Sequence, residues 1–431
     1  MVTPAFVSAD DAVRRIQPSD RVYLHEVAMT PHELLDALVR RAGELSGVET
    51  ISLHTEGPAP QVAPGLAGRI RHNALFAGAN VRAAINDGRA DYTPVFLSDV
   101  PGLFADRTLP LDVALLQVSP PDRHGFCRLG VSVACARAAA DHAKVVIGLV
   151  NPRVPLTLGN SAVHVSRFAA LVETNRALSV VEPGPIGPIE RQIGEHVAAL
   201  VEHRATLQLG IGAIPDAVLS CLGNREDLGV HTEMFSDGLV ALAEAGVITN
   251  RYKTTWRGRV VTSFALGSQR LYDFVDGNPF VEFHSSDIVN DTREIRRIER
   301  MVAINSALEI DLTGQVVADS IGELIYSGIG GQMDFIRGAR LAQGGKAIIA
   351  LPATAKGGTV SRIVPTINPG AGVVTTRGHV QYVATEYGVV NLAGESLRKR
   401  ADLLTTIAHP DARPDLRAAA AARHVSLPST T

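Results

Sequence analysis

Residues 206–215 read Thr206-Leu207-Gln208-Leu209-Gly210-Ile211-Gly212-Ala213-Ile214-Pro215, and this stretch decides the fold class. The apolar start predicts a strand, the glycines predict a tight turn, and Pro215 suits the first position of a helix over 216–222. Such a turn exposes unpaired backbone N–H groups, and glycine lets a ligand approach the backbone closely. The stretch therefore predicts either a ligand-binding turn or an ordinary connection between a strand and a helix.

A similar alternation of strands and helices extends on both sides of this stretch. The sequence predicts strands over 21–25, 48–54, 112–118 and 144–150, a helix after Thr30-Pro31 and another helix over 134–143. Short β-branched runs that alternate with amphipathic helices are typical of α/β folds with parallel strands. We therefore expect an α/β fold of two similar tandem domains, each with an open, mostly parallel sheet.

The boundary between these domains is expected where proline and glycine cluster. The segment Val181–Gly187 contains Pro183, Gly184, Pro185 and Gly187, and such residues interrupt regular structure. A chain of 431 residues is also too long for one ordinary hydrophobic core. We predict an N-terminal α/β domain over 1–185 and a C-terminal α/β domain over 186–431.

Composition and charge exclude several classes of protein. With 41 Lys+Arg against 44 Asp+Glu, the formal net charge is −3, so no bulk basic field would attract nucleic acid or an anionic membrane. No apolar run reaches about 18 residues, and the N-terminus lacks the apolar core of a signal peptide. The 3 cysteines, without a CxxC pair, indicate buried thiols in a reducing compartment. We therefore expect a cytoplasmic protein that binds neither nucleic acid nor membrane.

A second loop in the C-terminal half carries a glutamate. It reads Leu228-Gly229-Val230-His231-Thr232-Glu233-Met234-Phe235-Ser236-Asp237-Gly238, which predicts a short strand and then a helix that Ser236 or Asp237 can cap. Glu233 therefore lies near the carboxyl end of a strand, where ligands bind in open α/β sheets. From its position alone the residue is either a catalytic carboxylate or a solvated surface charge.

A third loop contains a run of glycines before a predicted helix over 336–342. It reads Tyr326-Ser327-Gly328-Ile329-Gly330-Gly331-Gln332-Met333-Asp334-Phe335, and a buried strand over 346–351 follows. A glycine loop at a helix N-terminus suits close contact with an anionic ligand. Arg362 follows this strand and is either a phosphate ligand or one partner of a surface salt bridge.

Several other chemistries lack their motifs. Pro215 occupies the sixth position of G-x-G-x-x-G, so the first loop is not a dinucleotide-binding fingerprint. No P-loop occurs, and Lys356-Gly357-Gly358-Thr359 has suitable residue types in the wrong order. The sequence also lacks a G-x-S-x-G nucleophile elbow, an H-E-x-x-H motif and zinc-ligand spacing among its 14 histidines. We therefore expect no metal and no permanently bound cofactor.

Taken together and in order, the motifs resemble the acetyl-CoA hydrolase/transferase family, most closely its 4-hydroxybutyrate CoA-transferase type. The strings that carry the resemblance are Ser119–Gly125, Gly159-Asn160-Ser161, Gln208–Pro215, His231–Gly238, Ser327–Phe335, Tyr382–Leu392 and His409-Pro410. They cover nearly the whole chain, and each is weak alone. The resemblance implies two CoA-transferase-like α/β domains, with the catalytic glutamate in the second.

The resemblance also implies roles for individual residues. Glu233 takes the position of the family's catalytic glutamate, and Gln208 takes that of a glutamine near the acyl group. The expected CoA-binding positions are Gly210, Ile211, Gly212, Ala213, Ile214, Gly328, Gly330, Gly331 and Gln332, with Arg362 as a phosphate ligand and Asn160 at the cleft between the domains. His25 is a weaker candidate for the acyl pocket, because the residues Glu26–Met29 that follow it are bulkier than in the family.

The activity that the resemblance implies is transfer of CoA between an acyl-CoA, of the acetyl, butyryl or 4-hydroxybutyryl class, and a small carboxylate. Glu233 would attack the thioester and become a glutamyl-CoA thioester, which predicts ping-pong kinetics. Coenzyme A is then a substrate, and a homodimer or larger homo-oligomer is expected. Two alternatives remain: an acyl-CoA hydrolase that uses the same glutamate, and a non-catalytic acyl-CoA-binding protein. The sequence does not specify the acyl group or the acceptor acid.

Overall fold

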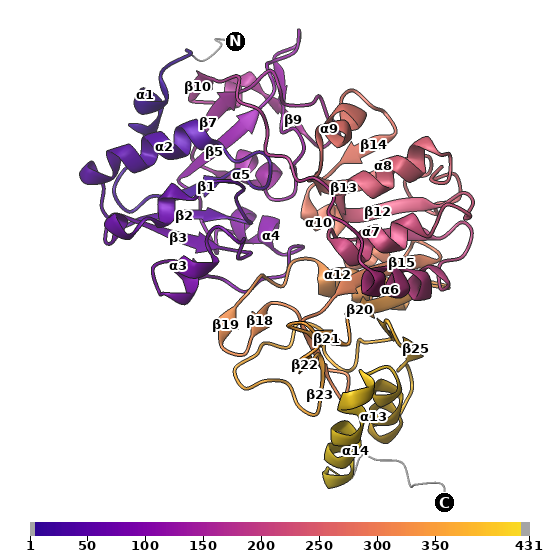
Figure 1. The fold of residues 1–431 in the computed structure, drawn as a ribbon. Coiled ribbons are helices and arrows are strands. Elements are labelled where there is room, and N and C mark those ends of the chain that lie inside the picture. The colour runs from indigo at the N-terminus through magenta and orange to yellow at the C-terminus, as the bar shows by residue number, and fades with distance from the viewer. Residues whose placement is uncertain (1–4, 424–431) are drawn as a thin grey trace, which may run out of the picture.

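The computed structural model describes residues 5–423, and its first half forms one open parallel sheet (Figure 1). In spatial order the 7 strands are β10 (Ala170–Glu173), β7 (Val145–Val150), β5 (Val113–Val118), β1 (Arg21–Leu24), β2 (Val48–Ser52), β3 (Ile70–Ala74) and β4 (Asp91–Tyr92). Every neighbouring pair is parallel. All strands predicted in this half are therefore present, within one or two residues at their ends.

The second half forms a sheet of 9 strands. Their order is β25 (Gly388–Asn391), β24 (Tyr382–Thr385), β20 (Lys346–Ala350), β15 (Met301–Ser306), β11 (Thr206–Leu209), β12 (Gly229–Phe235), β13 (Val260–Ala265), β14 (Val281–Phe283) and β8 (Leu158–Gly159). Only the β24–β25 pair is antiparallel. The α/β class with two mostly parallel sheets is thus confirmed. The domain boundary at residue 185 stays a prediction. One strand crosses this boundary, because β8 comes from the first half and pairs with β14.

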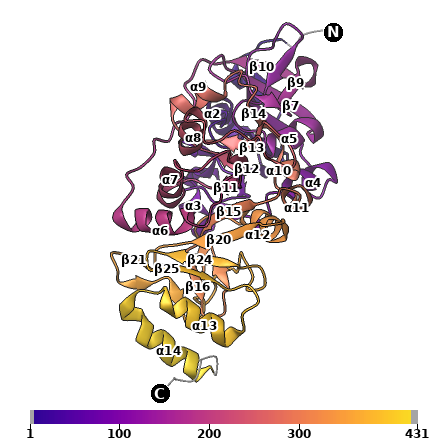
Figure 2. The same cartoon turned by 90° about the vertical axis from the view of Figure 1, so that its right-hand side faces the viewer.

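Helices follow most strands and cover the sheets (Figure 1). They are α1 (Ala9–Val13), α2 (His32–Arg40), α3 (Arg82–Asn86), α4 (Val100–Ala105), α5 (Ala136–His142), α6 (Pro188–Ala198), α7 (Ala213–Ser220), α8 (Asp237–Glu244), α9 (Gln269–Val275), α10 (Ser286–Val289), α11 (Thr292–Ile295), α12 (Gln332–Leu341), α13 (Leu397–Thr406) and α14 (Arg413–Ala422). No helix within residues 5–423 has the length and apolar character needed to cross a membrane. Figure 2 shows α13 and α14 at the C-terminal end, below β24 and β25.

Short strands complete the second half and connect it to the first. They are β16 (Glu309–Asp311), β17 (Val316–Val317), β18 (Ser320–Ile321), β19 (Leu324–Ile325), β21 (Thr354–Ala355), β22 (Val360–Ser361) and β23 (Ile363–Val364), and the pair β6 (Phe126–Arg128) and β9 (Ala162–His164) lies in the first half. The β18–β19 hairpin reaches α3: the Asn86 side chain donates to the Ile325 carbonyl and accepts from its N–H, both at 2.9 Å. The Arg82 guanidinium lies 4.0 Å from the Tyr326 ring centre.

The apolar core joins the two halves. One cluster of buried side chains contains Leu116 and Val118 of β5 together with Phe235 of β12 and Phe264 of β13. Residues 132–134 also add backbone contacts, since the Val133 N–H donates to the Ser263 carbonyl over 2.9 Å. The two sheets are therefore packed together at the edge where the candidate site lies.

Two helix starts differ from the sequence prediction by about one turn, those of α7 and α12, whereas α5 begins at Ala136 against a predicted 134. α7 begins at Ala213, so Pro215 is its third residue rather than its first. Proline is tolerated there because the N–H groups of the first helical turn have no carbonyl partner within the helix. α12 begins at Gln332, whereas the prediction placed its start at Ile336. The prediction assigned Gln332–Phe335 to the glycine loop, but these residues form the first turn of the helix, and Gly331 is its N-cap.

Candidate active site

Glu233 lies near the carboxyl end of β12, and its half-buried side chain lines a cavity of about 460 Å³. The cavity follows the carboxyl edge of the second sheet, the edge where open α/β sheets bind ligands. It also receives Phe76 from the first half of the chain. The glutamate is therefore not a solvated surface charge but part of a cavity between the two halves.

Both predicted glycine loops contribute to this cavity. Of the candidate residues, the structure brings together Glu233, Gly210, Ile211, Gly328, Gly330, Gly331, Gln332 and Arg362. The residues that complete its lining include the end of β15, Ile304 to Ser306, and Tyr326 at the rim. One carboxylate thus faces two loops whose backbone can approach a ligand closely.

The Glu233 carboxylate lies directly against the backbone of Gly331. A Cβ atom on Gly331 would overlap with Oε2 of Glu233 and with Nδ2 of Asn290. Gly330 has φ +57°, in the left-handed region that glycine favours. The loop must therefore be glycine-rich for two reasons, its conformation at residue 330 and the absence of space at residue 331.

A chain of hydrogen bonds holds the carboxylate from behind. The buried Asn290 donates through Nδ2 to Oε2 of Glu233 at 2.9 Å and to Oδ2 of Asp334 at 3.2 Å. Ser98, from the first half, donates through Oγ to Oδ1 of Asp334 at 2.9 Å. The Asn290 amide thus lies between the carboxylates of Glu233 and Asp334. Ser98, from the first half of the chain, holds the Asp334 carboxylate in place.

Burial raises the pKa of Glu233 to about 7. The hydrogen bond from Asn290 opposes this shift, the charge of Asp334 adds to it, and the backbone of Gly331 lowers it. Burial likewise raises the pKa of Asp334 to about 6, against the hydrogen bonds from Ser98 and Asn290. A partly desolvated carboxylate with a pKa near neutrality is a stronger nucleophile than a free glutamate, because less water must be removed before it attacks.

The third loop is held in place by the first half of the chain. The Leu97 N–H donates to the Gly330 carbonyl and the Ala77 N–H donates to the Ser327 carbonyl, each at 3.0 Å. A Cβ on Gly328 would lie 2.7 Å from Cδ2 of Phe76, so this aromatic ring packs directly on the loop. The position of the loop relative to Glu233 therefore depends on contacts between the two halves.

Arg362 lines the cavity and Gln208 lies beside it, and both side chains form hydrogen bonds with neighbouring residues. The Gln208 amide is buried and accepts from Nδ2 of Asn305 at 2.9 Å, and Asn305 lines the cavity. Arg362 donates through Nη1 to the Ala307 carbonyl at 3.1 Å, while its buried Nε atom has no partner among the described residues. Arg362 accordingly places a positively charged side chain in the cavity lining. Gln208 supports the wall of the cavity through its hydrogen bond with Asn305.

The remaining candidates lie elsewhere. Gly212, Ala213 and Ile214 form the start of α7 beside the cavity and are not among its lining residues. His25 is fully buried, with its two ring nitrogens 3.1 Å and 2.8 Å from the carbonyls of Gln117 and Ser132. Burial lowers the pKa of His25 to about 4, so the ring is neutral and joins backbone segments of the first half.

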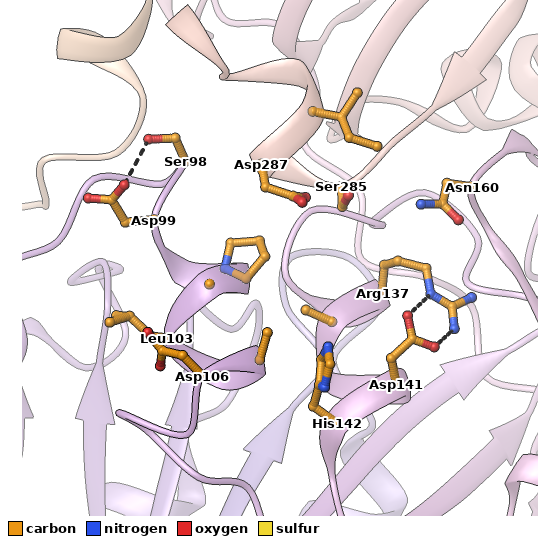
Figure 3. Close-up of a pocket in the computed structure, with 15 residues that line it drawn as sticks. Ser98, Asp99, Leu103, Asp106, Arg137, Asp141, His142, Asn160, Ser285 and Asp287 are labelled. Carbon is orange, nitrogen blue, oxygen red and sulfur yellow. Dashed lines mark hydrogen bonds and ion pairs between the residues drawn. The ribbon is translucent and has the colours of Figure 1, made fainter.

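Asn160 lines a different cavity, of about 580 Å³, shown in Figure 3. This cavity lies between α4, α5 and α10, with the Arg137 and Asp141 side chains paired on one wall and Ser98 at the opposite end. Its charged side chains are mainly acidic: Asp99, Asp106, Asp141 and Asp287 stand against Arg137 and His142. The structure therefore does not bring Asn160 together with Glu233.

Comparisons with known proteins show which family the chain belongs to. The family model for the acetyl-CoA hydrolase/transferase N-terminal domain matches residues 3–182, and the model for the C-terminal domain matches residues 267–420. The chain belongs to the acetyl-CoA hydrolase/transferase family. The predicted resemblance is therefore confirmed, and with it the assignment to a family of CoA-transferring enzymes.

Curated relatives of this acetyl-CoA hydrolase/transferase family member include the 4-hydroxybutyrate coenzyme A transferase of Clostridium kluyveri, 49% identical over 95% of this chain and 96% of that protein. The succinyl-CoA:acetate/propanoyl-CoA:succinate CoA transferase of Fasciola hepatica is 46% identical over 98% of this chain and 89% of that protein. Proteins named acetyl-CoA hydrolase, from Candida albicans and Kluyveromyces lactis, are 26% and 28% identical over 79% and 60% of this chain.

Solved structures of similar proteins have the same fold. RipA from Yersinia pestis superimposes with a TM-score of 0.91 at 35% identity, and the match covers 97% of each chain. The 4-hydroxybutyrate CoA-transferase from Porphyromonas gingivalis gives a TM-score of 0.84 at 39% identity, again over 97% of each chain. Because the matches span nearly the full length, they include both sheets.

Four residues that the structure places at the site were hardly predictable from the sequence. Asp334 was visible next to the third glycine loop, but its bond to Asn290 was not. Phe76, Ser98 and Asn290 lie in segments without a distinctive motif, and only the tertiary structure brings them to Glu233. Within residues 5–423 no group of three or more His, Cys, Asp or Glu side chains is placed to hold a metal ion.

Proposed function

We propose that the protein transfers coenzyme A between an acyl-CoA and a small carboxylic acid, with Glu233 as the covalent nucleophile. The observation that carries the proposal is the position of this carboxylate, half-buried between Asn290 and the Gly331 backbone in a cavity that both glycine loops line. Relatives at 33% to 49% identity are named CoA transferases, which supports transfer rather than hydrolysis.

In the first half-reaction the Glu233 carboxylate attacks the thioester carbonyl and forms a tetrahedral oxyanion. The C–S bond then breaks, which leaves a mixed anhydride on Glu233 and releases CoA as a thiolate. The thiolate attacks the glutamyl carbonyl of the anhydride, the first acid leaves as a carboxylate, and the enzyme carries a glutamyl-CoA thioester. A second carboxylate reverses these steps and leaves as the new acyl-CoA, so Glu233 returns to its starting state.

Each oxyanion requires hydrogen-bond donors that are already in position. Residues of both glycine loops line the cavity, so their backbone N–H groups are the candidate donors, and one such donor is typically worth about 3–4 kcal/mol of barrier. Asn290 is a second kind of donor, since its Nδ2 group already holds Oε2 of Glu233. Gln208 acts less directly, because its amide is paired with Asn305.

A direct test is intact-mass analysis after mixing with an acyl-CoA in the absence of an acceptor acid. The expected result is a covalent CoA adduct on Glu233 that disappears when a carboxylate is added. CoA release at the same rate with and without carboxylate would favour the hydrolase alternative. Binding of acyl-CoA without an adduct or turnover would favour a non-catalytic binding protein.

The proposed substrates are acyl-CoA esters of the acetyl, butyryl or 4-hydroxybutyryl class. The relatives' names include 4-hydroxybutyrate, butyryl-CoA with acetate, and succinyl-CoA with cyclohexane-1-carboxylate, so the family accepts acids of different shape. A panel of acyl-CoA donors and carboxylate acceptors, ranked by kcat/KM, would assign the pair.

We further propose a cytoplasmic homo-oligomer, a homodimer or larger. A reducing compartment is supported by the cysteines, because Cys127, Cys135 and Cys221 are all free thiols. Light scattering coupled to size exclusion tests the oligomeric state, and cell fractionation tests the location.

A further inference from the structure

The strand that carries the nucleophile also carries a histidine to which the mechanism assigns no role. His231 lies two residues before Glu233 on β12, so the two side chains leave the strand on the same face of the sheet. His231 is fully buried and is not among the residues that line the Glu233 cavity. The histidine therefore lies behind the nucleophile, where it contacts protein and not substrate.

The His231 ring forms one hydrogen bond. Its Nε2 atom lies 2.8 Å from the carbonyl oxygen of Val289. A carbonyl can only accept, so Nε2 carries the proton and donates it. The other ring nitrogen, Nδ1, is buried and has no hydrogen-bond partner within residues 5–423. The ring is therefore a donor that acts on a single backbone carbonyl.

This carbonyl belongs to the last residue of α10, a helix of 4 residues that contacts β12. The last carbonyls of a helix have no N–H partner within the helix, and His231 supplies a donor to this one. Because the peptide bond is planar, the carbonyl of Val289 and the N and Cα atoms of Asn290 lie in one plane. The bond from His231 therefore orients the peptide from which the Asn290 side chain projects.

Asn290 in turn holds the nucleophile, through the bonds from its Nδ2 atom to Glu233 at 2.9 Å and to Asp334 at 3.2 Å. The His231 ring also packs against the helix that carries Asp334. Its centre lies 6.2 Å from the ring centre of Phe335, the next residue on α12. One buried ring thus contacts both segments that flank the Glu233 carboxylate, the end of α10 and the first turn of α12.

The charge of His231 is constant over the pH range in which Glu233 ionises. Burial lowers the pKa of His231 to about 3, and the charge of Lys253 adds to this shift. The hydrogen bond to Val289 opposes the shift, and His284 lowers the pKa further. The imidazole is therefore neutral, and it acts through the direction of its N–H group rather than through a charge.

We propose that His231 is a positioning residue for the nucleophile: its Nε2–H group fixes the Val289 carbonyl and thereby the Asn290 amide that holds Glu233. The inference rests on the proposed function, since it takes Glu233 to be the attacking carboxylate. Without the His231 donor, the Asn290 amide is no longer fixed, and the carboxylate loses a hydrogen bond and its alignment with the thioester.

Two substitutions of His231 separate the donor from the bulk of the ring. His231→Leu keeps an apolar side chain but removes the donor, whereas His231→Gln keeps an N–H group close to the position of Nε2. The leucine variant is expected to lower kcat roughly tenfold or more, because the carboxylate is misplaced, with little change in the KM for the acyl-CoA. The glutamine variant is expected to restore kcat toward the wild-type value.

The pH–rate profile distinguishes positioning from a purely structural role. In His231→Leu the acid limb is expected to move to higher pH, because a carboxylate with fewer hydrogen-bond donors ionises less readily. His231→Gln should move it back. His72→Leu is the matched control, since His72 is buried on β3 and bonds to Thr50; it is expected to leave the limb in place. A limb that stays in place in His231→Leu would overturn the inference.

A double substitution tests the route through Asn290. Asn290→Ala alone is expected to move the acid limb in the same direction as His231→Leu. If His231 acts through Asn290, adding His231→Leu to Asn290→Ala should move the limb no further. Shifts that add up in the double variant would show that His231 does not act through the Asn290 amide.

An infrared titration keeps the test independent of catalysis. The carboxyl absorption of Glu233 is obtained by subtracting the spectrum of the matching Glu233→Gln variant, and it is expected to titrate at higher pH in His231→Leu than in the wild type. If this shift is present but the wild type forms no CoA adduct, the proposed function is refuted and the positioning role stands. An unshifted titration in a protein that forms the adduct would refute the positioning role alone.

Discussion

The Glu233 carboxylate occupies the space that a side chain on residue 331 would need, since a Cβ atom on Gly331 would overlap with its Oε2 atom. The nucleophile and the glycine backbone are thus in direct contact. Any side chain at residue 331 must displace the Glu233 carboxylate, the Asn290 amide or the loop itself.

Substitution of Gly331 tests this contact. Gly331→Ala is expected to lower kcat by roughly 10²-fold, because a misplacement of about 1 Å is enough for such a loss. Circular dichroism and kcat measured with one acyl-CoA donor check the prediction. Gly223→Ala is the control, since a Cβ there meets nothing within 4 Å. An alanine at residue 331 with wild-type kcat would contradict the proposed packing.

Substitution of Glu233 tests the nucleophile. Glu233→Ala and Glu233→Gln are expected to lower transfer by at least roughly 10³-fold and to abolish the covalent adduct. Glu233→Asp is expected to retain little activity, because the shorter side chain withdraws the carboxylate from the thioester. Glu323→Gln, at an exposed hairpin position, should behave as the wild type. Adduct formation in the alanine variant would assign the chemistry to another residue.

The acid limb of the pH–rate profile reports ionisation of Glu233. The attacking form is the carboxylate, and because the pKa is raised to about 7, activity is expected to fall as the pH drops below 7. In Asp334→Asn a neighbouring negative charge is absent, so the acid limb should move to lower pH. Asp36→Asn, exposed on α2, is the control. An unmoved limb in Asp334→Asn would show that Asp334 does not influence the nucleophile.

The same shift affects stability. The folded state keeps the Glu233 proton up to a pKa of about 7, against 4.5 in the unfolded chain, so between these values the folded state binds more protons. The contribution of Glu233 to stability therefore decreases as the pH rises through this window. Urea titrations of the wild type and of Glu233→Gln should differ in their pH dependence between 4.5 and 7. Parallel curves would contradict the raised pKa.

Lys253 gives a prediction for stability away from the site. It is 2% exposed and donates to the carbonyls of Val230 and Arg259 at 2.7 Å and 2.8 Å. Lys253→Met leaves both carbonyls without their donor, so we expect a loss of about 1–3 kcal/mol in unfolding free energy, measured by urea titration. Activity per folded molecule should remain unchanged, and Lys399→Met should have no effect on stability.

The sequence was most informative where function depends on local backbone. The three loops contain the glycines that permit close approach, so their positions and the candidate Glu233 were visible without a structure. The family and the α/β class were predictable for the same reason, because strand–turn–helix units are local patterns. Both predictions are confirmed. The exact helix starts were wrong where proline lies in the first turn, as in α7, or where glycines directly precede the helix, as in α12, since these residues also occur in loops.

Residues that act through tertiary contacts could not be predicted. Ser98 and Asp334 are separated by 236 residues, and no pattern around either one indicates that they meet. Asn290 is buried beside two carboxylates, but a single asparagine has many equally ordinary environments. Asn160 was expected in the cleft with Glu233, and the structure places it in the cavity of Figure 3 instead.

The strand β8 has a consequence for how the chain responds to a protease. Residues Leu158–Gly159 belong to the first half but form the edge of the second sheet, beside β14. The proline-rich segment Val181–Gly187 that follows is largely exposed and carries no regular structure up to Gly187. A nick there would leave two fragments that share one sheet, so they would remain associated under native conditions and separate only when denatured.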